Sequence, residues 1–303
     1  MTAPVEPPTM PADATVLPGL GRRALRSLRH DLPALISVGL LVVLALAAVF
    51  APLLAPHPPL QTYPEGLSPQ GGPVGPGSHF LLGSDPNGRD VLSRLLYGAR
   101  VSLVIGILAN GLATVLGVFV GLVAGYLGGW VETALMRITD VVMSFPILLF
   151  CIALIAVTGP SERNVVIVIA VIYWTTLARI IRSLVLSLKE REFVVAARTM
   201  GLSHWRIMRR HLFPHLVPTI IVYATLGVAS SILIEASLSF LGVGVPVPNA
   251  SWGQMIEQGK EYFQIAPWLL FAPGVCLLLT VLAFNLAGDW LRDLLDPTAP
   301  ERR

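Results

Sequence analysis

Residues 191–218 read REFVVAARTMGLSHWRIMRRHLFPHLVP, a basic and amphipathic stretch between two long apolar segments. Apolar side chains recur in its first part at helical spacing, at Phe193, Ala197 and Met200. A second set follows, with arginines on the other faces, at Trp205, Met208 and Leu212. This periodicity predicts two short helices, so the stretch is a structured connector and not a flexible tether.

The connector is expected to turn sharply at Gly201. A helix often ends in a left-handed glycine, and Leu202 can supply the hydrophobic contact that accompanies such a cap. Ser203 suits the N-cap of the second short helix. Pro214 and Pro218 are expected to end that helix.

The composition indicates an integral membrane protein. Of the 303 residues, 54% are hydrophobic and only 13% are charged, with a mean hydropathy of +0.72. A soluble domain has nearer to a quarter of charged residues. Two cysteines, Cys151 and Cys276, lie inside apolar runs, where small buried hydrophobes are their expected role and no disulfide is implied. The net charge of +3 is too small to indicate a partner, and no nucleic acid is expected.

Six apolar segments are long enough to cross a bilayer, which takes about 20 residues. They cover about 32–54, 101–127, 138–157, 164–181, 219–241 and 268–287. We therefore expect an all-α polytopic membrane protein with six transmembrane helices. Its predicted parts are a disordered basic N-terminus (1–31), a first anchor (32–54), a Pro/Gly-rich loop with an amphipathic helix (55–100), a core (101–290) that holds the connector (about 183–217), and a tail (291–303).

The distribution of basic residues predicts the orientation. Six spans place both termini on one side of the membrane, together with the connector. Sixteen Lys and Arg residues fall on that side and four on the other, with Arg100 at a border. Because positive charge is retained in the cytoplasm, both termini and the connector are expected there.

The second span carries small residues at every fourth position: Ala109, Ala113, Gly117, Gly121, Gly125 and Gly129. Residues four apart share one helix face, and small side chains let another helix approach closely in lipid. The spacing predicts a tight helix–helix contact along this face.

Residues 80–100 read FLLGSDPNGRDVLSRLLYGAR. A polar turn is expected first, formed by Gly83, Asp85, Gly88, Arg89 and Asp90. A short amphipathic helix then leads into the second span, with its apolar side formed by Val91, Leu92, Leu95 and Leu96. Such a segment is suited to the membrane surface.

Three ionisable residues lie deeper than the loops. Arg137 and Asp140 are three apart and are expected to pair on one helix face. Glu235 lies well inside the fifth span, where a carboxylate must face protein or water because exposure to hydrocarbon is costly. It either lines a pathway or makes an internal helix–helix hydrogen bond, and the sequence leaves both interpretations open.

Enzyme functions have little support. Residues 253–260 (GQMIEQGK) imitate a Walker A loop, but five residues separate the glycines where four are required, and Glu261 stands where Ser or Thr must bind magnesium. His211 and His215 are four apart without a third ligand nearby. We therefore expect no catalytic residues, no metal and no cofactor.

The connector resembles the cytoplasmic loop signature of ABC-importer permeases. It matches this signature at Ala196, Ala197, Gly201 and Pro214, and departs from it at Val195, His211 and Phe213. Residues 80–100 are similar to a run found in peptide/nickel importer permeases of the second-subunit type. Two further stretches agree with that subfamily, RITDVVMSFP at 137–146 and EASLSFLGVGVPVPNASWG at 235–253.

This resemblance implies a type I ABC importer permease in a bacterial inner membrane, forming half of a translocation pore. It implies as partners a second homologous permease subunit, two ABC ATPase subunits that hydrolyse ATP, and an extracytoplasmic solute-binding protein. Di- or oligopeptides are the implied solutes, with nickel and glutathione as alternatives. A stand-alone secondary transporter is the competing class, and only Glu235 and Asp140 could form its ion site.

The resemblance also implies roles for particular residues. Those expected to couple to the ATPases are Ala196, Ala197, Gly201, Leu202, Ser203 and Trp205. The pathway candidate is Glu235. The outer segment is represented by Asp85, Gly88, Arg89 and Asp90.

Overall fold

The computed structural model describes Leu25 and residues 27–295. Within these residues the fold is helical, with two isolated β-bridges and no strand. The remaining segments, 1–24, 26 and 296–303, lie outside the described residues. Most of the N-terminus predicted to be disordered (1–31) and most of the predicted tail fall in these segments. The prediction of disorder is wrong for Leu25 and residues 27–30, which are helical.

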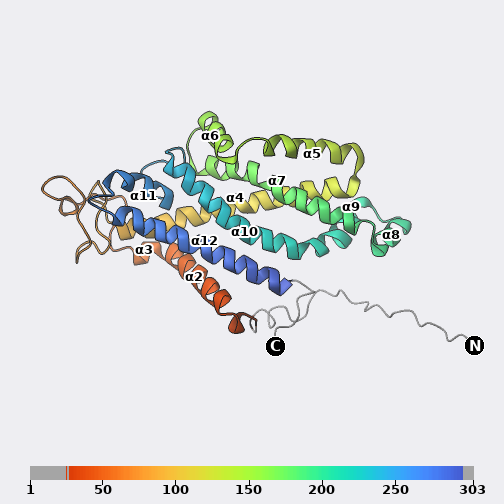
Figure 1. Ribbon diagram of the computed structural model, residues 1–303, viewed down its shortest axis with the longest axis horizontal. Helices are drawn as coiled ribbons and strands as arrows, with labels where there is room; N and C mark the ends of the chain where they lie inside the picture. Colours follow the sequence, from red (N-terminus) through yellow and green to blue (C-terminus); the bar gives the residue numbers. More distant parts are fainter. Residues whose placement is uncertain (1–24, 26, 296–303) are drawn as a thin grey trace, which may run out of the picture.

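Long helices run side by side along the longest dimension of the molecule (Figure 1). Five are long and apolar enough to cross a membrane, and a bent helix pair raises the number to six. The five are α2 (Leu32–Val49), α4 (Val91–Leu127), α7 (Glu162–Leu188), the continuous stretch that ends in α10 (Phe213–Phe240), and α12 (Trp268–Leu295). The expectation of an all-α polytopic fold is therefore confirmed.

The third predicted span is not one straight helix. It consists of α5 (Gly129–Met143) and α6 (Ile147–Thr158), which meet at 91°. Pro146 lies at the break as the N-cap of α6. Proline has no N–H to donate and disfavours helical backbone in the residue before it, so the helix ends at Met143 and starts again at Ile147.

The second span begins earlier than predicted. α4 is continuous from Val91 to Leu127, so the expected short amphipathic helix forms its first turns. Asp90 caps this helix, because its Oδ2 accepts hydrogen bonds from the Ser93 backbone N–H (2.8 Å) and from the Ser93 hydroxyl (2.6 Å). At 37 residues, α4 is about 55 Å long.

The connector contains α8 (Glu192–Thr199) and α9 (His204–Ile207), but the second short helix does not end at Pro214. It continues through a π-helical turn, η2 (Met208–Leu212), directly into α10. Pro214 lies just after this π-helical turn and does not end the helix. Pro218 lies inside α10 and does not end it.

The small-residue face of α4 packs against α7, as the spacing predicted. A Cβ atom added to Gly117 would lie 2.7 Å from the Trp174 carbonyl oxygen, and one added to Gly121 would lie 2.5 Å from the Ala178 carbonyl oxygen. Gly125 is similarly close to Val185. The two backbones touch because no side chain separates them. Gly129 does not belong to this face, because α4 ends at Leu127 and Gly129 begins α5.

One end of the molecule, here named the loop end, gathers α3 (Ala51–Leu54), η1 (Pro64–Gly66), α11 (Trp252–Gly259) and η3 (Lys260–Tyr262) (Figure 1). The predicted Pro/Gly-rich loop folds onto this end through backbone hydrogen bonds such as Tyr63 N–H to Gly88 O (3.0 Å). Trp252 is fully buried and donates to the Leu95 carbonyl at 3.1 Å. The opposite end, formed by α8 and α9, is the connector end.

The α4–α7 contact can be tested with Gly121→Leu. The new side chain would meet the α7 backbone, so we expect the free energy of unfolding to fall by about 1–3 kcal/mol, as in other overpacked cores. Thermal unfolding of the detergent-purified protein measures this. Gly111→Leu is the matched control in the same helix, because nothing lies within 4 Å of a Cβ there. An equal loss of stability in both variants would contradict the contact.

Candidate functional site

The turn of the connector has the predicted left-handed glycine. Gly201 has φ of 75°, its N–H donates to the Arg198 carbonyl (2.9 Å), and the Leu202 N–H donates to the Ala197 carbonyl (3.2 Å). These two bonds form a Schellman cap. Ser203 stands at the N-cap of α9 as predicted, but its side chain makes no capping hydrogen bond.

The connector presents a different apolar face from the one predicted. Trp205 is 59% exposed, whereas Met208 and Leu212 are buried, so the three do not share a face. The π-turn at 208–212 has more residues per turn than an α-helix, which rotates Leu212 away from the face that an α-helix would place it on with Trp205. In α8, Ala197 is buried and Ala196 exposed. The exposed large apolar side chains of the connector are Phe193, Val195, Met200, Trp205 and Phe213.

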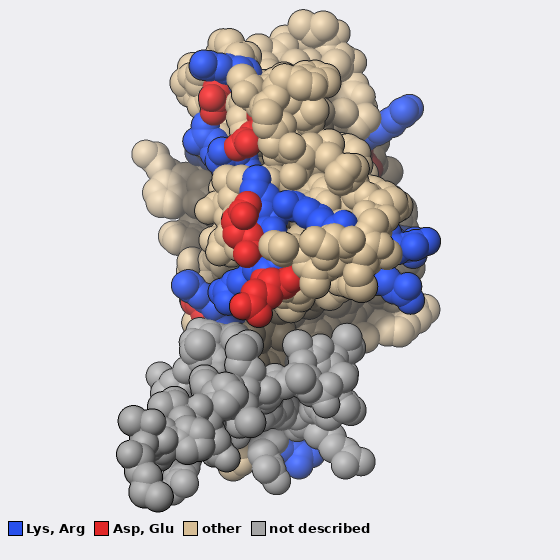
Figure 2. Space-filling view, turned by 90° about the vertical axis from the view of Figure 1, so that its right-hand side faces the viewer, with Lys and Arg blue, Asp and Glu red and all other residues tan. Residues whose placement is uncertain are grey.

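The connector is attached to the last turn of α4. The Tyr126 hydroxyl lies 3.2 Å from His204 Nδ1, and the Arg198 guanidinium lies 5.1 Å from the centre of the Tyr126 ring. Lys189 donates to the Gly125 carbonyl at 3.1 Å. Figure 2 looks onto this end and shows Lys and Arg side chains gathered over it, with fewer Asp and Glu between them. A displacement of the connector would therefore act directly on α4.

Glu235 is fully buried and joins three helices. Its Oε1 accepts from the Ser239 hydroxyl (2.7 Å) and its Oε2 from the Ser102 hydroxyl (3.1 Å). The Ser102 hydroxyl oxygen accepts a hydrogen bond from the backbone N–H of Trp252 (3.2 Å). Glu235 of α10, Ser102 of α4 and Trp252 of α11 therefore meet at this point. Of the two interpretations left open by the sequence, this geometry matches the internal helix–helix hydrogen bond. Any role in a pathway stays a prediction.

The polar turn before α4 is a buried charge cluster. Asp85 Oδ2 accepts from Arg89 Nε at 2.6 Å and lies 3.3 Å from Arg94 Nε. Asp85 Oδ1 accepts the backbone N–H groups of Asn87 and Arg89, both at 2.9 Å, and Gly88 has φ of 71°. Arg89 is only 7% exposed, which excludes a merely solvated charge. The sequence does not single out Arg94. The one indication is that this charged residue stands among the apolar residues that begin α4.

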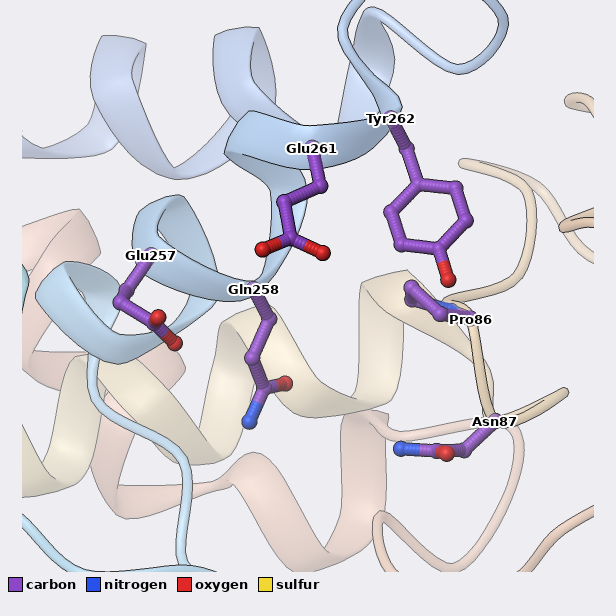
Figure 3. A pocket seen from close by; sticks show the side chains of 6 residues that line it. All are labelled: Pro86, Asn87, Glu257, Gln258, Glu261 and Tyr262. Atoms are coloured by element: carbon purple, nitrogen blue, oxygen red, sulfur yellow. The ribbon is translucent and has the colours of Figure 1, made fainter. Parts of the chain in front are cut away.

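A polar hollow of about 240 Å³ lies beside this cluster (Figure 3). Its lining comes from the turn and from α11 and η3, and consists of Pro86, Asn87, Glu257, Gln258, Glu261 and Tyr262. Gln258 connects it to the cluster, since its Oε1 lies 3.4 Å from Arg89 Nη2 and 3.3 Å from Arg94 Nη2. A molecule bound at the hollow would thus touch groups anchored to α4.

The predicted pairing of Arg137 with Asp140 is wrong. Asp140 Oδ1 accepts instead from Arg179 Nη2 of α7 at 2.5 Å, and Glu132 pairs with Arg182 one turn of α7 further on. Both bonds join α5 to α7. Because α7 lies beside α5, its arginines reach these carboxylates across the helices, a proximity that sequence spacing does not reveal. Among the residues described, no three His, Cys, Asp or Glu side chains are grouped as a metal site would require.

Comparison with known proteins gives the family. Residues 117–299 match the model of the binding-protein-dependent transport system inner membrane component, and residues 19–70 match the N-terminal TM domain of oligopeptide transport permease C. The dipeptide transport system permease protein DppC of Alkalihalophilus pseudofirmus is 38% identical over 97% of this chain and 94% of its own length. The nickel transport system permease protein NikC of Escherichia coli is 40% identical over 85% and 92%.

The fold has a solved counterpart. A chain of the inward-facing MetNI methionine ABC transporter superposes with a TM-score of 0.55 at 20% identity, covering 68% of this chain and 97% of that one. This likeness concerns the fold alone and agrees with the expected type I importer architecture. Since a family model covers more than half of the chain and relatives above 30% identity cover most of it, the chain belongs to the binding-protein-dependent transport system inner membrane components, as a permease subunit of an ABC importer and not an enzyme.

Proposed function

We propose that this permease forms half of the translocation pathway of an ATP-driven importer of di- or oligopeptides. The observation that carries the proposal is the similarity to a dipeptide permease over 97% of the chain, together with the match of residues 19–70 to an oligopeptide permease model. Nickel is the alternative solute, supported by 40% identity to a nickel permease over 85% of the chain.

The partners follow from the proposed function. A second homologous permease would complete the pore, two ABC ATPases would dock at the connector end, and an extracytoplasmic binding protein would deliver the solute at the loop end. The exposed apolar side chains Met200 and Trp205 support the ATPase contact, since solvent-facing groups of this kind mark protein interfaces. The hollow beside Gln258 supports contact with the binding protein or shaping of an outer gate.

The geometry supports a mechanism in which the connector drives α4. Closure of the ATPases would displace α8 and α9, and the contacts of Tyr126 with His204 and Arg198 would pass the displacement to α4. α4 runs unbroken to Asp90 at the loop end. One rigid helix therefore links the ATPase side to the charged turn that faces the binding protein.

Uptake by the reconstituted complex tests the solute. We expect proteoliposomes holding both permeases and both ATPases to accumulate labelled dipeptide when ATP and the loaded binding protein are present. Radioactive nickel is the parallel substrate. Accumulation of nickel without dipeptide would replace the proposed solute with the alternative.

A further prediction concerns the orientation in the membrane, which rests on the sixteen-to-four division of basic residues. Cysteines introduced by Gln70→Cys and Ser203→Cys, with Cys151 and Cys276 replaced, should react from opposite sides of the membrane. Both positions are exposed, so burial cannot account for a lack of reaction. Reaction of Ser203→Cys with an impermeant reagent in intact cells would reverse the topology.

Another prediction concerns the helix cap at Gly201. Its φ of 75° costs an L-residue about 1–2 kcal/mol, and valine is worse because it is β-branched. Gly201→Val should insert normally but reorient α8 against α9, so that loaded binding protein no longer stimulates ATPase activity. Gly159→Val is the control, because Gly159 also has positive φ and open space but lies between α6 and α7. Native stimulation in Gly201→Val would refute the coupling role.

A further inference from the structure

α5 and its C-cap residue carry a line of polar side chains that are exposed in the described structure. They recur at intervals of four, three and four residues, which places them on one face of the helix. All four are exposed: Thr133, Arg137, Asp140 and Ser144. This is unusual in the first half of a membrane span, whose other exposed side chains are apolar, such as Ile138 and Val141.

α7 lies beside α5 and carries a matching line. Arg179, Ser183 and Ser187 are four residues apart and exposed, while the opposite face of α7 is buried against α4 at Ala178 and Ile181. The bond between Asp140 Oδ1 and Arg179 Nη2 joins the two lines into one surface. We name this surface the polar strip; it is formed by the three α5 residues, the C-cap residue Ser144 and the three α7 residues.

The polar strip reaches deep into the membrane. Trp130, at the start of α5, is 80% exposed, and tryptophan is typical of the membrane–water interface. Asp140 lies ten residues further along, about 15 Å, which is about half of a 30 Å hydrocarbon core. Asp140 and Arg179 are 49% and 47% exposed at this depth. Charged groups placed there face water or protein, not lipid.

Two features favour water over a second subunit. Helices that pack in membranes meet through small residues, as at Gly121, whereas the polar strip carries long guanidinium side chains. Arg137 forms no ion pair with any residue that the structure describes, so its burial in an interface would require a carboxylate from the partner, whereas water solvates the charge without one. α5 has a separate apolar face, with Ile138 and Val141, for lipid or a partner.

We propose that the polar strip lines the water-filled passage of the importer, and that Arg137, Asp140 and Arg179 contact the charged groups of the passing solute. The two guanidinium groups exceed the single carboxylate by one positive charge, so they suit the carboxylate of a peptide, which arginine binds with two hydrogen bonds. Asp140 suits its ammonium group. An exposed ion pair is weak, so a zwitterion can displace it readily. The solute assignment rests on the proposed function.

Thiol accessibility tests the lining in the assembled transporter in proteoliposomes. Ser144→Cys and Ser183→Cys are placed on the polar strip, and Ile138→Cys and Val141→Cys serve as exposed apolar controls, all with Cys151 and Cys276 replaced. Because only the thiolate reacts and it forms only in water, a charged methanethiosulfonate should modify the strip positions about tenfold faster or more. Equal rates at all four positions would overturn the proposal.

Charge substitution tests the solute contact. With saturating loaded binding protein, Arg137→Gln should reduce dipeptide turnover about tenfold, the scale expected for one charge-assisted contact, while stimulation of ATPase activity is retained. Arg137→Lys should restore most of the turnover. Native turnover in Arg137→Gln, or a parallel loss of ATPase stimulation, would remove Arg137 from the passage.

The two kinds of failure are distinguishable. The labelling pattern does not depend on which solute is carried. The reagent would therefore modify Ser144→Cys and Ser183→Cys rapidly in a nickel importer as well. A strip covered by the second permease would instead leave both cysteines unreactive in a transporter that still imports dipeptide. Rapid labelling in a transporter that imports nickel corrects the proposed solute and supports the polar strip as the lining of the passage. Unreactive cysteines in a transporter that imports dipeptide refute only the proposal that the polar strip lines the passage.

Discussion

The close approach of α4 and α7 supports the rest of the molecule. Glycines 117, 121 and 125 bring the two backbones into contact. This contact fixes the separation of the helices, so side chains of α7 can reach bonding partners on α4 and α5. The ion pair of Glu132 with Arg182 and the bond from Lys189 to Gly125 both depend on it. α5 contacts little else in the described chain, so its position follows from this contact.

Features that depend only on neighbouring residues in the sequence could be predicted. Apolar length fixes the existence of the spans, and the left-handed turn needs only glycine at position 201, so both could be predicted. The break at Pro146 was missed because the apolar run continues through it. The helix end predicted at Pro214 was wrong because the helix continues through a π-helical turn and past this proline.

The polar character of the candidate sites could be predicted from the sequence, but the residues that they contact could not. The turn at 83–90 was recognised as polar, yet only the fold buries Arg89 and places Gln258 over it. The sequence spacing predicts an ion pair of Asp140 with Arg137, whereas the folded chain pairs Asp140 with Arg179 of a neighbouring helix. In each case the decisive neighbour comes from another helix. A single sequence contains no signal for such a contact.

The unbroken length of α4 also constrains how this chain can change in evolution. Tyr126 at one end holds the connector, and Asp90 at the other end caps the helix beside the buried Asp85–Arg89 pair. Each residue inserted or deleted between them would rotate one end about the axis by about 100° relative to the other. A substitution on a face of α4 that packs against nothing, as at Gly111, leaves both ends in place. A change in the number of residues would instead alter the orientation of one end relative to the other.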